Sequence, residues 1–166
     1  MKYLFISGAP NTGKTETIYD LTVYLISHGY EIVLMGNGDF VTQIPDSRTR
    51  VEDFQCVIEK KISEHITKRV LINSATDNEN RINSLLEFHK NNPNVDMIIT
   101  SMRDGGDAMR SFLKEKLNII PNTDIVVEVP LAKITRKRNL NTALRWYKKS
   151  INELVKLGLE KLHFSL

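Results

Sequence analysis

Short runs of apolar residues, many of them β-branched, alternate along this chain with longer segments in which hydrophobic residues recur at helical spacing. Most of the short runs are continuously apolar, which is typical of strands covered by helices on both faces. The alternation predicts a three-layer α/β/α sandwich with a mostly parallel sheet of about five or six strands. The predicted strands are residues 3–7, 31–35, 70–73, 95–100 and 124–129, with a further candidate edge strand at 162–164.

The segments between these runs carry start and stop signals of helices. Hydrophobic residues at helical spacing follow Gly13 and end near Gly29, whose lack of a Cβ suits a helix C-terminus. Thr76 and Glu79 have the spacing of a capping box, which predicts that a helix begins there. Further helices are predicted from the stripe Val51, Phe54, Ile58 and Ile62, from Met109, Phe112 and Leu113 after a cap at Asp107, and from periodic residues between 140 and 155 with a stop at Gly158.

The composition fits one ordinary domain over residues 1–166. The chain is 41% hydrophobic and 26% charged, and its formal net charge of +3 is too small to demand a polyanionic partner. No apolar run approaches the ~20 residues that a membrane-spanning helix needs, so we expect no membrane partner. The single cysteine, Cys56, cannot form an internal disulfide, and we expect a cytoplasmic protein in which Cys56 is a buried hydrophobic residue on a helix. The oligomeric state stays open.

The most specific pattern is GAPNTGKT at residues 8–15, which matches G-x-x-x-x-G-K-[ST] at every fixed position. It follows an apolar run and precedes an amphipathic segment, the strand–loop–helix setting that phosphate binding requires. The glycines allow the backbone to wrap around phosphates, and the start of the following helix carries partial positive charge. Lys14 can reach the β- and γ-phosphates of a nucleotide, and the Thr15 hydroxyl can ligate Mg²⁺.

This motif in this setting resembles the P-loop NTPase superfamily, in the variant whose Walker A motif directly follows the first strand. The resemblance implies that the chain binds Mg²⁺ with ATP or another nucleoside triphosphate, that Lys14 is catalytic and that Thr15 binds the metal. The specific match covers residues 8–15 alone and identifies no subfamily. The residues expected to contact the nucleotide are Gly8, Ala9, Pro10, Asn11, Thr12, Gly13, Lys14, Thr15 and Glu16.

The acidic residue that should complete the metal site is less easily placed. A Walker B strand ends in an acid that holds Mg²⁺, but the strand at 70–73 ends in Asn73. Asp77, shortly after that strand, is the first candidate, followed by Asp104 and Asp39. Each of the three could instead simply form a turn or cap a helix.

Two further segments are candidates for contacts beyond the nucleotide. Asp39, Arg48 and Arg50 follow the second predicted strand, at the sheet edge where ligands bind in such folds, although a solvated loop is an equal alternative. Residues 133–149 contain seven basic and no acidic residues, and Arg136 and Arg138 resemble the arginines of a small-molecule kinase lid. The alternatives for this basic stretch are a solvated helix face and a nucleic-acid contact.

Two classes of function follow from these observations. The first is a small kinase-like phosphotransferase that acts on a small-molecule acceptor, with arginines stabilising the transferred phosphoryl group. The second is a slow regulatory NTPase, whose nucleotide state moves a loop within residues 36–50 and acts through a protein or nucleic-acid partner. A zinc enzyme is not expected because the four histidines lack the spacing of zinc ligands.

Overall fold

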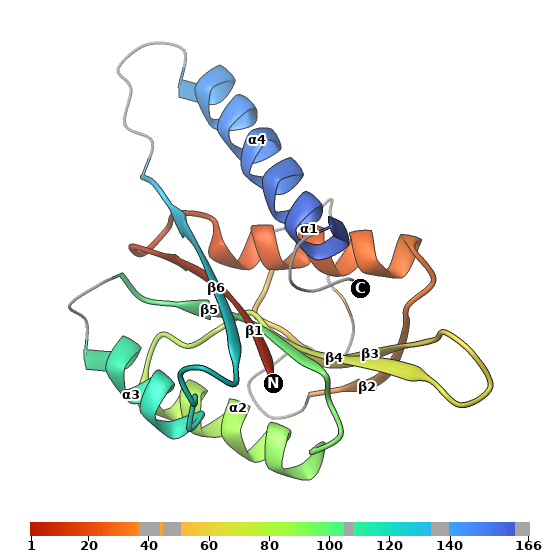
Figure 1. The fold of residues 1–166 in the computed structure, drawn as a ribbon. Coiled ribbons are helices and arrows are strands. Elements are labelled where there is room, and N and C mark those ends of the chain that lie inside the picture. The colour runs from red at the N-terminus through yellow and green to blue at the C-terminus, as the bar shows by residue number, and fades with distance from the viewer. Residues whose placement is uncertain (37–43, 45–50, 105–107, 134–139, 162–166) are drawn as a thin grey trace.

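The computed structural model describes residues 1–36, 44, 51–104, 108–133 and 140–161, without the side chains of residues 140 and 161 (Figure 1). Its centre is a six-stranded sheet with the order β2-β3-β4-β5-β1-β6. The four strands β4, β5, β1 and β6 are parallel, whereas β3 is antiparallel to both of its neighbours. The strands are β1 (Lys2–Gly8), β2 (Glu31–Met35), β3 (Gln55–Lys61), β4 (Thr67–Asn73), β5 (Met97–Met102) and β6 (Ile125–Leu131).

Helices cover both faces of this sheet, as Figure 1 shows. One hydrophobic cluster joins α1 and α4 to the sheet, and a second cluster joins α2 and α3 to the opposite face. The prediction of an α/β fold with helices on both faces is therefore confirmed. The helices are α1 (Lys14–Ser27), α2 (Glu79–Asn91), α3 (Ala108–Lys116) and α4 (Leu140–Lys161).

The prediction of a mostly parallel sheet is wrong at one side, because the expected helix over residues 51–62 is a strand. Residues 55–61 form β3, and β3 and β4 pair as an antiparallel hairpin. Val57 packs into the cluster with α2 and α3, whereas its neighbours Cys56 and Ile58 pack into the cluster with α1 and α4. Residues alternating between two cores are continuously apolar, so a strand and a buried helix segment give the same signal.

The predicted helix ends are correct in part. Gly29, at φ +88°, directly follows the C-cap residue of α1, as expected. At α2 the cap is Asn78, whose side chain accepts a hydrogen bond from the Arg81 amide, while the Thr76 hydroxyl bonds to Ser101 on β5. The predicted cap at Asp107 and the predicted strand at 162–164 lie outside the described residues.

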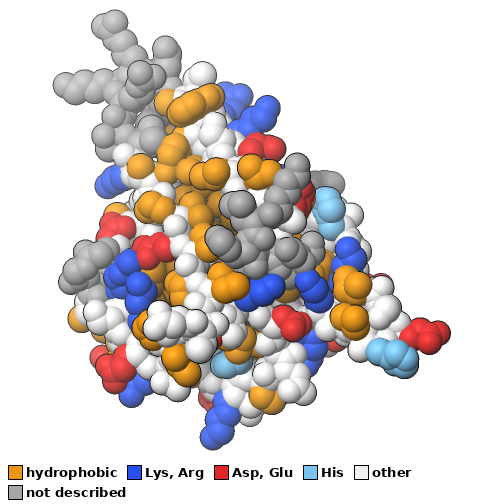
Figure 2. Space-filling model, in the orientation of Figure 1, with side chains coloured by type: hydrophobic (Ala, Val, Ile, Leu, Met, Phe, Trp, Pro, Cys, Tyr) orange, Lys and Arg blue, Asp and Glu red, His pale blue; other side chains and the backbone are white. Residues whose placement is uncertain are grey.

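Helix α4 does not stop at Gly158, as predicted, but continues to Lys161. Val155 and Leu159 lie on either side of the glycine and are 3% and 1% exposed, so burial outweighs the ~1 kcal/mol cost of glycine in a helix. Other parts of α4 remain open to solvent, including Trp146, which is 70% exposed. Figure 2 shows hydrophobic side chains along α4 on the visible face. Within the described part of the chain, no helix is long and apolar enough to cross a membrane.

Candidate functional site

The Gly8–Thr15 loop joins the end of β1 to the start of α1 in a tight turn. At Gly8, a Cβ would stand 2.6 Å from Thr12 Oγ1 and 2.9 Å from the carbonyl oxygen of Leu131 on β6, so a larger residue does not fit. Gly13 precedes α1 with a φ of +89°, in the left-handed region that favours glycine. The Thr12 hydroxyl donates a 3.0 Å hydrogen bond to the Ala9 carbonyl, which closes the turn. Both glycines of the motif are therefore required by the backbone itself.

Lys14 is the buried cation of this loop. Lys14 is 8% exposed, and its Nζ donates hydrogen bonds of 3.0 Å to the carbonyl oxygens of Gly8 and Ala9. Burial lowers the pKa of Lys14, while the carboxylates of Asp77, Asp104 and Asp53 act in the opposite direction. Lys14 therefore lies along the loop with its ammonium group surrounded by backbone oxygens and within the field of three acids.

Thr15 contacts a carboxylate that sequence reasoning missed. Its hydroxyl donates a 3.2 Å hydrogen bond to Asp53 Oδ1. Asp53 lies just before β3, and two hydrogen bonds between the next residue, Phe54, and Ser74 hold this segment in place. Because β3 is antiparallel to β4, its first residues lie at the same edge as the carboxyl end of β4. The incorrect helix over 51–62 concealed this placement.

Asp77, the predicted metal ligand, lies near the same place but is already engaged. Its carboxylate forms an ion pair with Arg103, in which Oδ1 lies 3.3 Å from Nε, and Arg103 Nη2 donates a hydrogen bond to the backbone carbonyl of Asp77. Asp104 follows Arg103 after the end of β5. The structure therefore places Asp53 in contact with Thr15. Asp77 lies nearby, paired with Arg103.

A cavity of 530 Å³ opens beside the loop at the carboxyl ends of the parallel strands. Some of the residues that line it were predicted from the sequence, namely those of the loop and the start of α1, and Asp77. The others were not predicted, and they come from the segment before β3, from the residue after β4 and from α2. Its walls are more polar than apolar, which suits a charged ligand. The lining residues are Pro10, Asn11, Gly13, Lys14, Thr15, Glu16, Val51, Glu52, Asp53, Ser74, Asp77 and Arg81.

Asn73 occupies the strand end where an acid was expected, and it has a structural role. It is fully buried, and its side-chain amide donates to the Ala75 carbonyl at 2.8 Å and to Thr100 Oγ1 at 2.9 Å. Its oxygen accepts a hydrogen bond from Gln55 Nε2 at 3.2 Å. These bonds link β3, β4 and β5, and Asn73 is not among the residues that line the cavity, so its role is structural.

Several residues that the sequence predicts to be functional lie outside the part of the chain that the structure describes. Asp39, Arg48 and Arg50, predicted to bind a substrate, lie outside the described residues. So do Arg136 and Arg138, the predicted lid arginines. Cys56 is buried as predicted, although on β3 and not on a helix, and burial raises the pKa of its thiol to about 12.

Neither clustered metal ligands nor similarity to known proteins assigns a role to this cavity. Among the residues that the structure describes, no group of three or more His, Cys, Asp and Glu side chains is placed to hold a metal ion. Comparisons with protein-family models, with curated proteins and with solved structures found no match to this chain.

Proposed function

We propose that this protein binds a nucleoside triphosphate, ATP or another NTP, together with Mg²⁺, in the cavity beside the Gly8–Thr15 loop. The observation that carries the proposal is the loop itself, which combines the P-loop pattern with a left-handed Gly13 and a buried Lys14. The backbone amides at the start of α1 and the helix dipole favour a phosphate there. Lys14 would exchange its bonds to two carbonyl oxygens for bonds to phosphate oxygens.

The donor set at Thr15 fits Mg²⁺. The ion prefers oxygen ligands, keeps several waters, and is commonly held by one or two carboxylates together with the phosphates of the substrate. Thr15 and Asp53 supply a hydroxyl and a carboxylate oxygen 3.2 Å apart, which is such a partial set. We therefore propose Asp53 as the main metal-side carboxylate, in place of Asp77. Bound Mg²⁺ would neutralise phosphate charge, while Lys14 and the loop would orient the phosphates.

The reaction that we propose is phosphoryl transfer to a small-molecule acceptor. Its support is the sequence of the basic stretch, whose Arg136 and Arg138 would stabilise charge on the transferred group. A cavity at the carboxyl edge of parallel strands gives both substrates a common approach.

A regulatory NTPase is the second candidate, and one specific observation favours it. The Thr15–Asp53 hydrogen bond joins the metal side of the site to the end of the segment that connects β2 with β3. Binding or loss of Mg²⁺ and the terminal phosphate would change this contact directly, as in a nucleotide-dependent switch.

Nucleotide binding is tested by calorimetry with Mg-ATP and Mg-GTP on the wild type and on Lys14→Ala. Loss of bonds from a buried cation to phosphate should weaken affinity by about 100-fold or more. Lys90→Ala removes an exposed lysine of α2 and should leave affinity unchanged. Equal affinity in wild type and Lys14→Ala, with both proteins folded, would contradict the proposal. Labelled nucleotide with a panel of metabolites then separates transfer to an acceptor from slow release of phosphate.

A further inference from the structure

Lys148 on α4 lies against the second glycine of the Gly8–Thr15 loop. A Cβ on Gly13 would stand 3.6 Å from Lys148 Cε and 3.9 Å from Lys148 Nζ. Gly13 lines the 530 Å³ cavity, so the ammonium group of Lys148 lies close to one residue of the cavity wall, although Lys148 is not itself among the lining residues. Lys148 is one of the seven basic residues of 133–149 and is far from the Gly8–Thr15 loop in the sequence, but the fold places it beside this loop.

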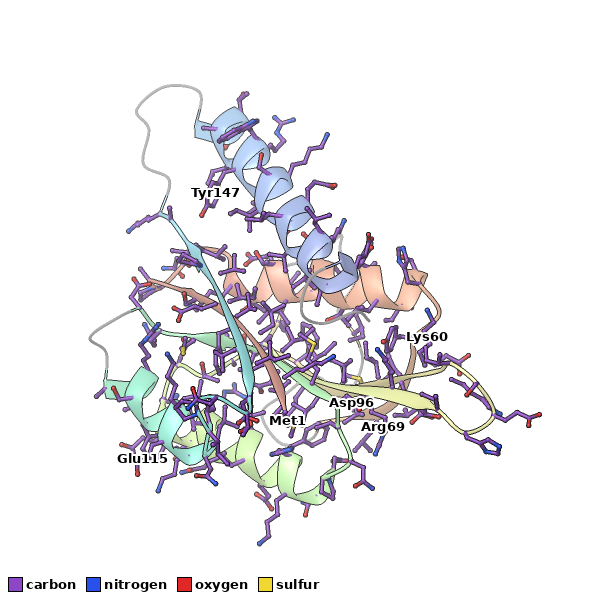
Figure 3. The ribbon with its side chains drawn as sticks, in the orientation of Figure 1. Met1, Lys60, Arg69, Asp96, Glu115 and Tyr147 are labelled. Atoms are coloured by element: carbon purple, nitrogen blue, oxygen red, sulfur yellow. The ribbon has the colours of Figure 1, made fainter. Side chains whose placement is uncertain are left out.

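The position of Lys148 is set by anchors on both sides of it along α4. The hydroxyl of the preceding residue, Tyr147, accepts a 2.5 Å hydrogen bond from the Ala132 amide, just after β6. Figure 3 shows Tyr147 on the side of α4 that faces the end of this strand. One turn later, Asn152 Nδ2 donates a 2.6 Å bond to Asp20 on α1. These bonds, with the buried Val155, hold this part of α4 over the first turns of α1.

We propose that Lys148 is a second phosphate-binding cation, which the C-terminal helix supplies to the nucleotide held by the Gly8–Thr15 loop. The inference rests on the proposed nucleotide binding. Lys14 is bonded to carbonyl oxygens at the start of the loop, whereas Lys148 approaches at Gly13 near its end. The two lysines would therefore bind the phosphate chain from different positions. A lysine stem is long and flexible enough to move its ammonium group onto a phosphate oxygen without moving α4.

Charge compensation is the competing explanation. Glu16 Oε2 also lies 3.6 Å from the position of a Cβ on Gly13, so Lys148 and Glu16 flank the same point. Lys148 could serve only to neutralise this carboxylate, which would otherwise repel a phosphate. A direct bond and mere neutralisation differ in what happens when Glu16 is removed.

The first test compares Lys148→Met with Lys149→Met, which removes the same charge from the neighbouring exposed residue of α4. Affinities for Mg-ATP, Mg-ADP and adenosine are measured by calorimetry, and thermal unfolding confirms that both variants fold. Lys148→Met should weaken Mg-ATP binding by about 10-fold and leave adenosine binding unchanged, because a charge-assisted bond to phosphate is lost. Lys149→Met should change either affinity less than about two-fold. Equal effects of the two variants would overturn the inference.

The second test repeats Lys148→Met in a Glu16→Gln background. A direct phosphate bond predicts the same loss of about 10-fold, since the bond is made whether or not Glu16 is charged. If Glu16→Gln restores binding to Lys148→Met, neutralisation explains the lysine and the inference is wrong. The proposed function fails separately, if wild type binds no Mg-nucleotide or if Lys14→Ala binds as well as wild type.

Discussion

Asp53 and Thr15 are 38 positions apart in the sequence, yet they share a hydrogen bond. No local pattern reveals such a pair, because the contact depends on the direction of β3. The loop residues could be predicted because the two glycines, Lys14 and Thr15 lie in one contiguous stretch with a recognisable spacing. Asp53, which we propose as the metal-side carboxylate, could not be predicted in this way. Asp77 and Asp104 follow predicted strands, whereas Asp53 precedes β3, whose residues have the pattern of a helix.

If Asp53 is the metal-side carboxylate, as we propose, Asp53→Asn and Asp77→Asn should differ in their effect on Mg²⁺ binding. Asp53→Asn should raise the Mg²⁺ concentration needed for tight ATP binding by about 10-fold, since the amide is a poorer ligand for Mg²⁺. Asp77→Asn should have a smaller effect, because its carboxylate is paired with Arg103. ATP titrations over a series of Mg²⁺ concentrations measure both values. A larger effect at Asp77 would return the metal to the residue first predicted.

The hydrogen bonds of Asn73 lead us to expect that an acid at this position, where a Walker B motif would have one, destabilises the fold. Asn73→Asp removes the donor to Ala75 and Thr100 and places a carboxylate in a fully buried position beside a carbonyl oxygen. We expect a loss of about 3 kcal/mol or more in the free energy of unfolding, measured by urea denaturation at pH 7. Asn73→Ser, which retains a small polar group, should cost less. Unchanged stability of Asn73→Asp would show that the site tolerates the acid.

Among the secondary-structure elements, two of the incorrect predictions have the same cause. The stripe Val51, Phe54, Ile58 and Ile62 predicts a helix over residues 51–62, and Gly158 predicts the end of the last helix, both on local pattern alone. In the structure, β3 is buried between two helical layers, and Leu159 beyond the glycine is 1% exposed. Packing against distant elements decides both cases.

Replacing Gly158 and Gly29 by alanine should change the stability of the protein in opposite directions. Gly158 lies inside α4, and a Cβ there would meet nothing within 4 Å, so Gly158→Ala should stabilise the protein by about 0.5–1 kcal/mol. Gly29 follows α1 with a φ of +88°, where alanine is strained, so Gly29→Ala should destabilise by about 1 kcal/mol. Thermal unfolding of the two variants measures both. Effects of the same sign would contradict these assignments of backbone conformation.

For the whole molecule, stability depends on elements from both faces being fixed to one sheet. Arg110 on α3 forms a bidentate ion pair with Glu128 on β6, and Lys114 lies nearby. Burial opposes ionisation of Glu128, but hydrogen bonds from Arg110 and Ser7 and the charges of Arg110 and Lys114 leave its pKa below the ordinary value of 4.5. The fold class could be predicted because two hydrophobic layers require it, whereas ion pairs between elements could not.

This ion pair predicts how stability changes with pH. A carboxyl whose pKa is lower in the folded than in the unfolded protein contributes stability above its unfolded value, and loses it as the pH falls through the folded value. Glu128→Gln should therefore lower the melting temperature at pH 7 and make its decline below about pH 4.5 shallower. Melting curves of wild type and variant between neutral and acidic pH test this. Parallel curves would show that the pair adds no pH-dependent stability.

The connection between β2 and β3 begins and ends at one place. The Gly36 amide donates a 2.6 Å hydrogen bond to the Gln55 carbonyl, so the chain leaves the sheet and rejoins it at neighbouring residues. For a flexible connection each doubling of length costs only about 0.6 kcal/mol of closure free energy, so the pairing of β2 with β3 should depend only weakly on the number of residues between Gly36 and Gln55. The number of residues between Gly36 and Gln55 is therefore free to change at little cost while the hydrophobic layers that pack on the sheet stay the same.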